Sequence, residues 1–166
     1  MPSAPQSTPA ILTLALCAAM WWQYFAFDPE RAEHMLTAAS SSERVRAAHG
    51  GYFYAFIPML LGVVMMATGV KESLGHFTST IDGPVASVLA GGVALYLLGQ
   101  VVFRLAMRFE MRTLRLIAPI LALGCAVLGM TVSTAAELTA LVLLLGVVAF
   151  NDYRQQPIDS SIPSTT

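Results

Sequence analysis

A glutamate and a histidine stand four residues apart, at Glu72 and His76, just after a long apolar stretch. On a helix this spacing puts both side chains on one face, where they could bind a cation or relay a proton. The same pair, with Lys71 beside it, is also typical of a helix that ends at a membrane interface, and we favour that interpretation. Glu30 and His34 repeat the spacing, but two ligands do not make a zinc site, so there we expect a solvated helix.

Four arginines follow one another at helical spacing: Arg104, Arg108, Arg112 and Arg115. On a continuous helix they would form a basic stripe, which we expect to contact lipid phosphates and to orient the protein. A site for an anionic ligand is the alternative. Glu137 follows Thr134 at the spacing of a capping box, so we expect it to cap the start of the last apolar stretch rather than to bind an ion.

Motifs for catalysis or cofactor binding are lacking in the sequence. It contains no Gly-rich phosphate loop, no Cys/His metal array, no nucleophile elbow and no haem-attachment sequence. We therefore predict no catalytic residue, no cofactor, no metal site and no nucleic-acid partner. The first four apolar stretches also lack an ionisable group at their centres, which argues against an autonomous ion pump.

Five apolar stretches fill most of the 166 residues, and they span residues 10–27, 51–70, 84–103, 114–130 and 135–150. A membrane-spanning helix needs about 20 apolar residues, at about 1.5 Å each. Hydrophobic residues make up 56% of the chain and charged residues only 11%, whereas soluble domains carry about 25% charge. We predict an all-α bundle of five transmembrane helices, with disordered tails at residues 1–9 and 154–166.

The positions of the basic residues predict the orientation in the membrane. Five spans put every Lys and Arg except Lys71 on one side. Cytoplasmic loops retain Lys and Arg, so we expect a protein of the cell membrane with its N-terminus outside and its C-terminus in the cytoplasm. Aromatic residues cluster near the predicted cytoplasmic boundary, which agrees with this orientation.

Small residues recur at the spacing at which membrane helices pack closely. The pairs are Ala15/Ala19, Gly62/Gly69, Ser87/Gly91, Gly92/Gly99, Ala118/Ala122 and Cys125/Gly129. They predict close contact between backbones inside the bundle. Cys17 and Cys125 lie within apolar stretches, and we expect them to be packing residues rather than a disulfide.

Two short motifs carry a resemblance to a known family. The first is Trp21-Trp22-Gln23-Tyr24-Phe25, and the second runs from Tyr52 through Tyr54 and Pro58 to Gly62, followed by Gly69 and then His76. With these motifs the chain resembles the bacterial low temperature requirement A (LtrA) membrane proteins over about residues 10–153. Phe56 stands where that family commonly has a histidine. The likeness corresponds to the C-terminal part of a typical member, without its upstream helices.

The resemblance implies no biochemical activity and no catalytic residue that can be carried over. We therefore expect a non-enzymatic helical bundle in the lipid bilayer that packs with itself or with a membrane protein supplying the upstream helices. Two alternatives are a small transporter or channel subunit, and a membrane-embedded enzyme. The enzyme would use either Glu72 and His76 or the cytoplasmic pair of His34 and His49.

Overall fold

A computed structural model describes residues 7–25, 54–73, 77–106 and 113–154 of the chain. The described residues form five α-helices and no strand, which confirms the predicted all-α class. The helices are α1 (Ser7–Phe25), α4 (Tyr54–Ser73), α5 (Gly83–Ala106), α6 (Thr113–Thr131) and α7 (Thr134–Arg154).

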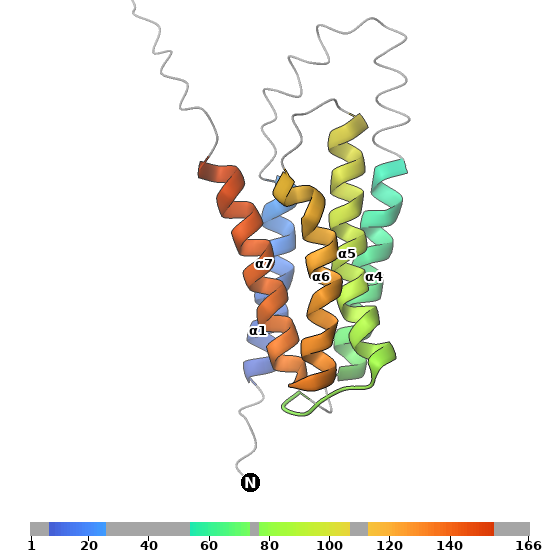
Figure 1. Ribbon diagram of the computed structural model, residues 1–166, viewed down its shortest axis with the longest axis vertical. Helices are drawn as coiled ribbons and strands as arrows, with labels where there is room; N and C mark the ends of the chain where they lie inside the picture. Colours follow the sequence, from blue (N-terminus) through green and yellow to red (C-terminus); the bar gives the residue numbers. More distant parts are fainter. Residues whose placement is uncertain (1–6, 26–53, 74–76, 107–112, 155–166) are drawn as a thin grey trace, which may run out of the picture.

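Four of these helices, α4, α5, α6 and α7, are long and apolar enough to cross a membrane. Helix α1, although as long as α6, is not in this group, because its last turns carry Trp, Gln and Tyr side chains that lower its mean hydropathy. Even so, α1 runs through the body of the bundle alongside α7 (Figure 1). The five predicted apolar stretches therefore correspond to five parallel or antiparallel bundle helices.

Two helix boundaries differ from the predicted ones in ways that matter. Helix α1 begins at Ser7, so residues 7–9 of the predicted disordered tail are helical. Pro9 then lies in the first turn, where a missing N–H breaks no helical hydrogen bond. Helix α7 continues through a polar last turn to Arg154, beyond the predicted end at residue 150. Burial of Asp152 explains that extension, as described below.

Successive helices run in opposite directions, and α5 occupies the centre of the bundle (Figure 1). Helix α4 packs along α5, α6 lies between α5 and α7, and α1 covers α7. Helices α1, α5 and α7 end at the same end of the bundle at which α4 and α6 begin. We call this the basic end, because Arg104, Arg115 and Arg154 lie there, whereas Lys71 lies at the opposite end.

Glycines bring the backbones of α4 and α5 into direct contact. A Cβ at Gly62 would lie 2.6 Å from the carbonyl oxygen of Gly92, and one at Gly69 would lie 2.8 Å from Cα of Leu89. A Cβ at Gly99 would lie 2.7 Å from Cγ of Met59. Real Cβ atoms do not approach other atoms so closely, so these positions tolerate only glycine. The predicted close packing of small residues is present at this interface.

The connections at the end opposite the basic end are tied together by backbone hydrogen bonds. The Ile81 amide donates to the carbonyl oxygen of Gly129 (3.2 Å), and the amide of Thr134 donates to that of Ser79 (3.3 Å). The side chains of Phe77 and Ile81 are buried beneath this connection. The segment between α4 and α5 thus closes this end of the bundle.

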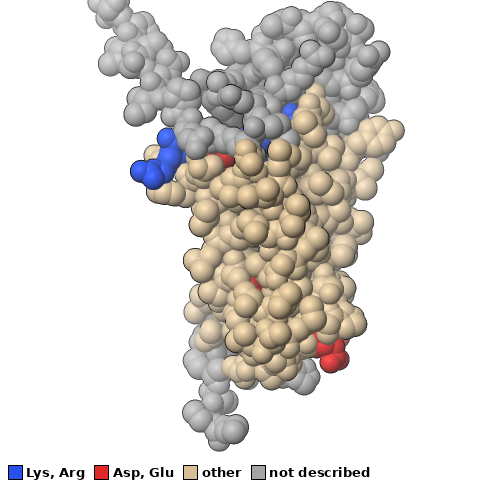
Figure 2. All heavy atoms as spheres, in the orientation of Figure 1, with Lys and Arg blue, Asp and Glu red and all other residues tan. Residues whose placement is uncertain are grey.

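The outer surface of the bundle is apolar over most of its height. Figure 2 shows a largely uncharged body, with basic atoms at the basic end and acidic atoms near both ends. Large apolar side chains such as Leu60, Val64, Ile120 and Leu143 are exposed along it. In water such a surface would drive aggregation, whereas in a bilayer it faces lipid.

Replacing Gly92 by alanine tests the α4–α5 contact. Its Cβ would overlap the Met66 amide nitrogen and lie 2.7 Å from the Gly62 carbonyl oxygen, so we expect Gly92→Ala to destabilise the protein by about 1–3 kcal/mol. The matched control is Gly91→Ala, whose Cβ would meet only Cε of Met65 at 3.6 Å. Thermal unfolding in detergent measures both variants, and equal melting temperatures would contradict the described interface.

Candidate functional site

A buried cluster of three polar side chains joins α5, α6 and α7 at the basic end. Arg115 in α6 is 4% exposed, and its Nε donates a hydrogen bond to Oδ2 of Asp152 in α7 (2.7 Å). A terminal nitrogen of the guanidinium group donates to the same carboxylate oxygen. The other terminal nitrogen donates to Oε1 of Gln100 in α5 (2.9 Å). The guanidinium group therefore connects three helices.

The helix ends explain why these side chains meet. Arg115 is in the first turn of α6 and Asp152 is in the last turn of α7, and both turns lie at the basic end. Two opposite charges taken out of water are tolerated when their geometry is good and further hydrogen bonds complete the pair. Gln100 supplies such a bond. This cluster has the character of a structural clamp.

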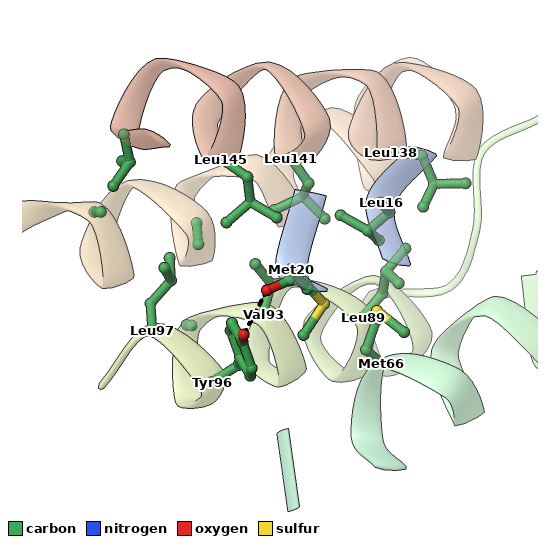
Figure 3. Packing of buried hydrophobic residues seen from close by; sticks show 14 of the residues in the cluster. Leu16, Met20, Met66, Leu89, Val93, Tyr96, Leu97, Leu138, Leu141 and Leu145 are labelled. Atoms are coloured by element: carbon green, nitrogen blue, oxygen red, sulfur yellow. Dashed lines mark hydrogen bonds between the residues drawn. The ribbon is translucent and has the colours of Figure 1, made fainter. Parts of the chain in front are cut away.

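Two further hydrogen bonds attach α1 to the bundle. Nε2 of Gln23 donates to the carbonyl oxygen of Leu145 in α7 (3.0 Å), and the Tyr96 hydroxyl of α5 donates to that of Met20 (2.6 Å; Figure 3). Around them the buried apolar side chains interlock, as Figure 3 shows for Leu16, Leu141 and others. Gln23 and Gln100 each form a hydrogen bond to another helix, although not to one another.

Another buried polar side chain, that of Glu137 in α7, has no hydrogen-bond partner among the described residues. The residue is 0% exposed, and neither carboxylate oxygen meets a donor within the described part of the protein. The side chain lies against Gly129 of α6, where a Cβ would overlap its Oε2 atom. The expected capping role is wrong: the Ser133 side chain caps α7 by accepting a hydrogen bond from the Ala136 amide (3.2 Å). The cap thus starts one residue earlier than predicted, which leaves Glu137 to point inward.

The aromatic motif of α1 lies at the basic end and is largely on the outer surface. Trp21, Trp22 and Phe25 are exposed, with the Trp21 and Phe25 rings 4.7 Å apart. The ring of Tyr24 meets Phe56 of α4 edge-on, with 6.1 Å between centroids. Phe56 therefore makes an apolar contact with the first motif.

The second motif contributes to packing rather than to a pocket of polar groups. Gly62 and Gly69 lie in the α4–α5 contact described above, and the helix continues through Pro58 without interruption. Tyr54 is exposed at the start of α4. Glu72 is exposed at its end, and His76 lies outside the described residues.

The predicted arginine stripe does not form on one helix. Helix α5 ends at Ala106 and α6 begins at Thr113, so Arg104 and Arg115 belong to two antiparallel helices. Arg108 and Arg112 lie between these helices, outside the described residues. Arg115 does not extend toward lipid phosphates, because its charge is paired with that of Asp152 inside the bundle.

Asp152 follows the last apolar stretch, which ends at Phe150, so the sequence pattern alone does not single it out. One signal in the sequence points to Asp152. Adjacent membrane helices are antiparallel, so an acidic residue just after the last apolar stretch reaches the same membrane boundary as an arginine at the start of the apolar stretch before it. The two form the ion pair of the basic end.

Metal binding finds no support in the described helices and turns, where no three His, Cys, Asp or Glu side chains gather. Both cysteines are free thiols.

The sequence of this bundle matches a known protein family. Residues 3–150 match the model of the bacterial low temperature requirement A protein (LtrA) family. This chain belongs to the LtrA family. The match extends over nearly the whole range of the expected resemblance and includes both aromatic motifs. LtrA membership together with the four membrane-length helices identifies a multi-pass membrane protein. No curated protein and no solved structure matches this LtrA family member significantly.

Removing one partner of the clamp should be costly, because the other charge would remain buried and unpaired. We expect Asp152→Ala to destabilise the protein by about 3–5 kcal/mol. The control is Arg154→Ala, which removes an exposed charge of the same helix turn and should have little effect on thermal unfolding in detergent. A double variant, Arg115→Met with Asp152→Leu, should regain much of the lost stability. If both single variants unfolded alike, the pair would not be a clamp.

Proposed function

We propose that this LtrA family member is a non-enzymatic membrane bundle whose role is to assemble, with a second copy or with another membrane protein. The observation that carries the proposal is a pair of outward-facing glycines. A Cβ at Gly124 of α6 or at Gly146 of α7 would meet no atom within 4 Å. Contacts within the chain therefore do not account for either glycine.

The inner glycines differ from Gly124 and Gly146 in what surrounds them. Gly62, Gly92 and Gly99 lie where a Cβ would clash, so their small size serves the internal packing. Gly124 and Gly146 are exposed near the middle of their helices, where a larger apolar residue would face lipid equally well. A helix gains backbone order from alanine relative to glycine, so glycine in these places needs another explanation.

A second helix that packs against this face from outside would explain the two glycines. In lipid no hydrophobic force draws helices together, and association depends on close packing at small residues. The side chains around the two glycines, including Val127, Leu143 and Val147, are exposed and apolar. They would form the walls of a shallow notch that receives an apolar partner helix. The proposed assembly role depends on surface shape and requires no reactive group.

The proposed orientation keeps the basic end in the cytoplasm and the N-terminus outside. Support comes from the arginines at the ends of α5 and α7 and from Lys71 standing at the other end. Cytoplasmic loops retain such residues. The exposed aromatic residues Trp21, Trp22 and Tyr54 at the same end suit a membrane interface.

Filling the notch tests the assembly. We expect Gly124→Leu or Gly146→Leu to raise the apparent Kd of association by about tenfold or more, the equivalent of 1.4 kcal/mol. Neither variant should change the melting temperature much, because both side chains would point away from the bundle. The matched control is Val64→Leu, which enlarges an exposed apolar residue of α4, a helix that packs on α5 and not on α6 or α7.

Association would be measured for the full chain in lipid nanodiscs or bilayers by single-molecule photobleaching, and heteromeric assembly by crosslinking in the native membrane. Glycine variants that assembled as well as the wild type would refute the notch as the interface. A wild-type chain that stayed monomeric and captured no crosslinked partner would refute the assembly role itself.

Accessible cysteines test the orientation. In a background with Cys17→Ala and Cys125→Ala, we expect Ser160→Cys to resist a membrane-impermeant maleimide in intact cells and to react after permeabilisation. Ser3→Cys serves as the opposite control and should react from outside. Labelling of Ser160→Cys in intact cells would reverse the proposed orientation.

A further inference from the structure

We propose that Glu137 is a proton-binding site inside the bundle, and that it exchanges its proton with the aqueous phase at the end opposite the basic end. The inference is independent of the assembly proposed above. It starts from a fully buried carboxyl group whose two oxygens both lack a hydrogen-bond donor among the described residues.

Among the described residues, no hydrogen-bond donor and no basic side chain is paired with the carboxyl group of Glu137. Gly129 of α6 lies against this group, Ala86 of α5 lies close to Gly129, and neither residue contributes a polar side chain. Cys125 of α6 is near enough for an electrostatic interaction, but its thiol donates to the carbonyl oxygen of Leu121. No basic side chain of the described helices faces the group. An ionised, unpaired carboxylate is strongly disfavoured in such a place, and a bound proton removes the charge.

A proton fits this site better than a metal cation does. A sodium or calcium ion needs several oxygen ligands, whereas no group of three His, Cys, Asp or Glu side chains gathers around Glu137 among the described residues. Gly129 leaves the space that the carboxyl group fills, since a Cβ there would overlap Oε2. The site is therefore shaped to one carboxyl group, with no further ligands in the described contacts.

The position of Glu137 along α7 makes proton access one-sided. It lies in the first turn of the helix, three residues after Thr134, so the end of the bundle is only about 5 Å away. Toward the basic end, the distance along α7 to Asp152 is about 22 Å. That path passes Leu138, Leu141 and Leu145, which are buried and apolar. Protons should therefore reach Glu137 past the connection between α4 and α5.

Protonation would also affect helix packing. Ionised, the carboxyl group would require water or a counter-ion beside Gly129, where α6 and α7 are in contact. Neutral, it fits the closed bundle. The occupancy of the site by a proton should therefore stabilise the contact between α6 and α7.

A hydrophobic carbodiimide is a direct probe, since it adds to protonated carboxyl groups in apolar surroundings and leaves an N-acylurea that mass spectrometry can locate. We expect dicyclohexylcarbodiimide to label the full chain in nanodiscs at Glu137, at a rate that falls as the buffer is made alkaline. Glu137→Gln should abolish this adduct. The matched control is Glu72→Gln, which removes an exposed carboxylate and should leave the labelling unchanged.

Three results would overturn the proposal. These are an absence of adduct at Glu137, a labelling rate independent of pH, and protection by sodium ions, which would indicate a cation site instead. Sidedness is tested in sealed vesicles of known orientation. Alkaline buffer at the end that carries Glu72 should slow the labelling, whereas the same change at the basic end should not, and the opposite result would refute the access route.

Thermal unfolding gives a second measurement that does not depend on the reagent. The melting temperature of the wild type should fall more steeply on alkalinisation than that of Glu137→Gln, because only the wild type has this proton to lose. Parallel pH profiles of the two proteins would contradict reversible proton binding at Glu137.

Discussion

The ion pair between Arg115 and Asp152 fixes how the helices meet at the basic end. Hydrocarbon offers no water to a polar group, so a side chain that stays charged inside the bundle needs a partner in the protein. The pair sets α6 against the last turn of α7, and the bond to Gln100 adds α5. Because α4 packs on α5 and α1 on α7, the remaining helices are arranged around this connection.

Elsewhere in the bundle, close contact between backbones holds helices together, as polar groups do at the basic end. The α4–α5 interface is made by glycines whose hydrogens face the opposite backbone, which maximises dispersion contacts where a hydrophobic force is lacking. Helix α1 contains no glycine; it packs through the buried side chains of Leu16 and Met20, and hydrogen bonds from Gln23 and Tyr96 to carbonyl oxygens attach it further. The bundle thus combines two kinds of contact, according to which residues each helix offers.

The apolar stretches predicted the helix class and most helix positions, because length and hydropathy alone decide what can reside in lipid. They could not predict partners at helix ends. The polar turn after Phe150 reads as a tail until Arg115 is known to face it. Likewise, a one-residue difference in the cap of α7, from Thr134 to Ser133, changes Glu137 from an expected capping residue into a buried one. The spacing of residues along the chain does not distinguish a capping or tail residue from a buried one, because contacts with the neighbouring helix determine which it is.

The two buried carboxyl groups of α7 illustrate how position determines role. Asp152 and Glu137 share a helix, and both are removed from water, yet one has a guanidinium partner and the other has a glycine. A clamp requires a charge that stays paired, and the basic end provides it. A site that binds and releases a proton requires a group without a fixed counter-charge, close enough to water to exchange. Glu137 meets both requirements within one turn of the end of its helix, while the apolar side chains beyond it separate the two ends of the bundle.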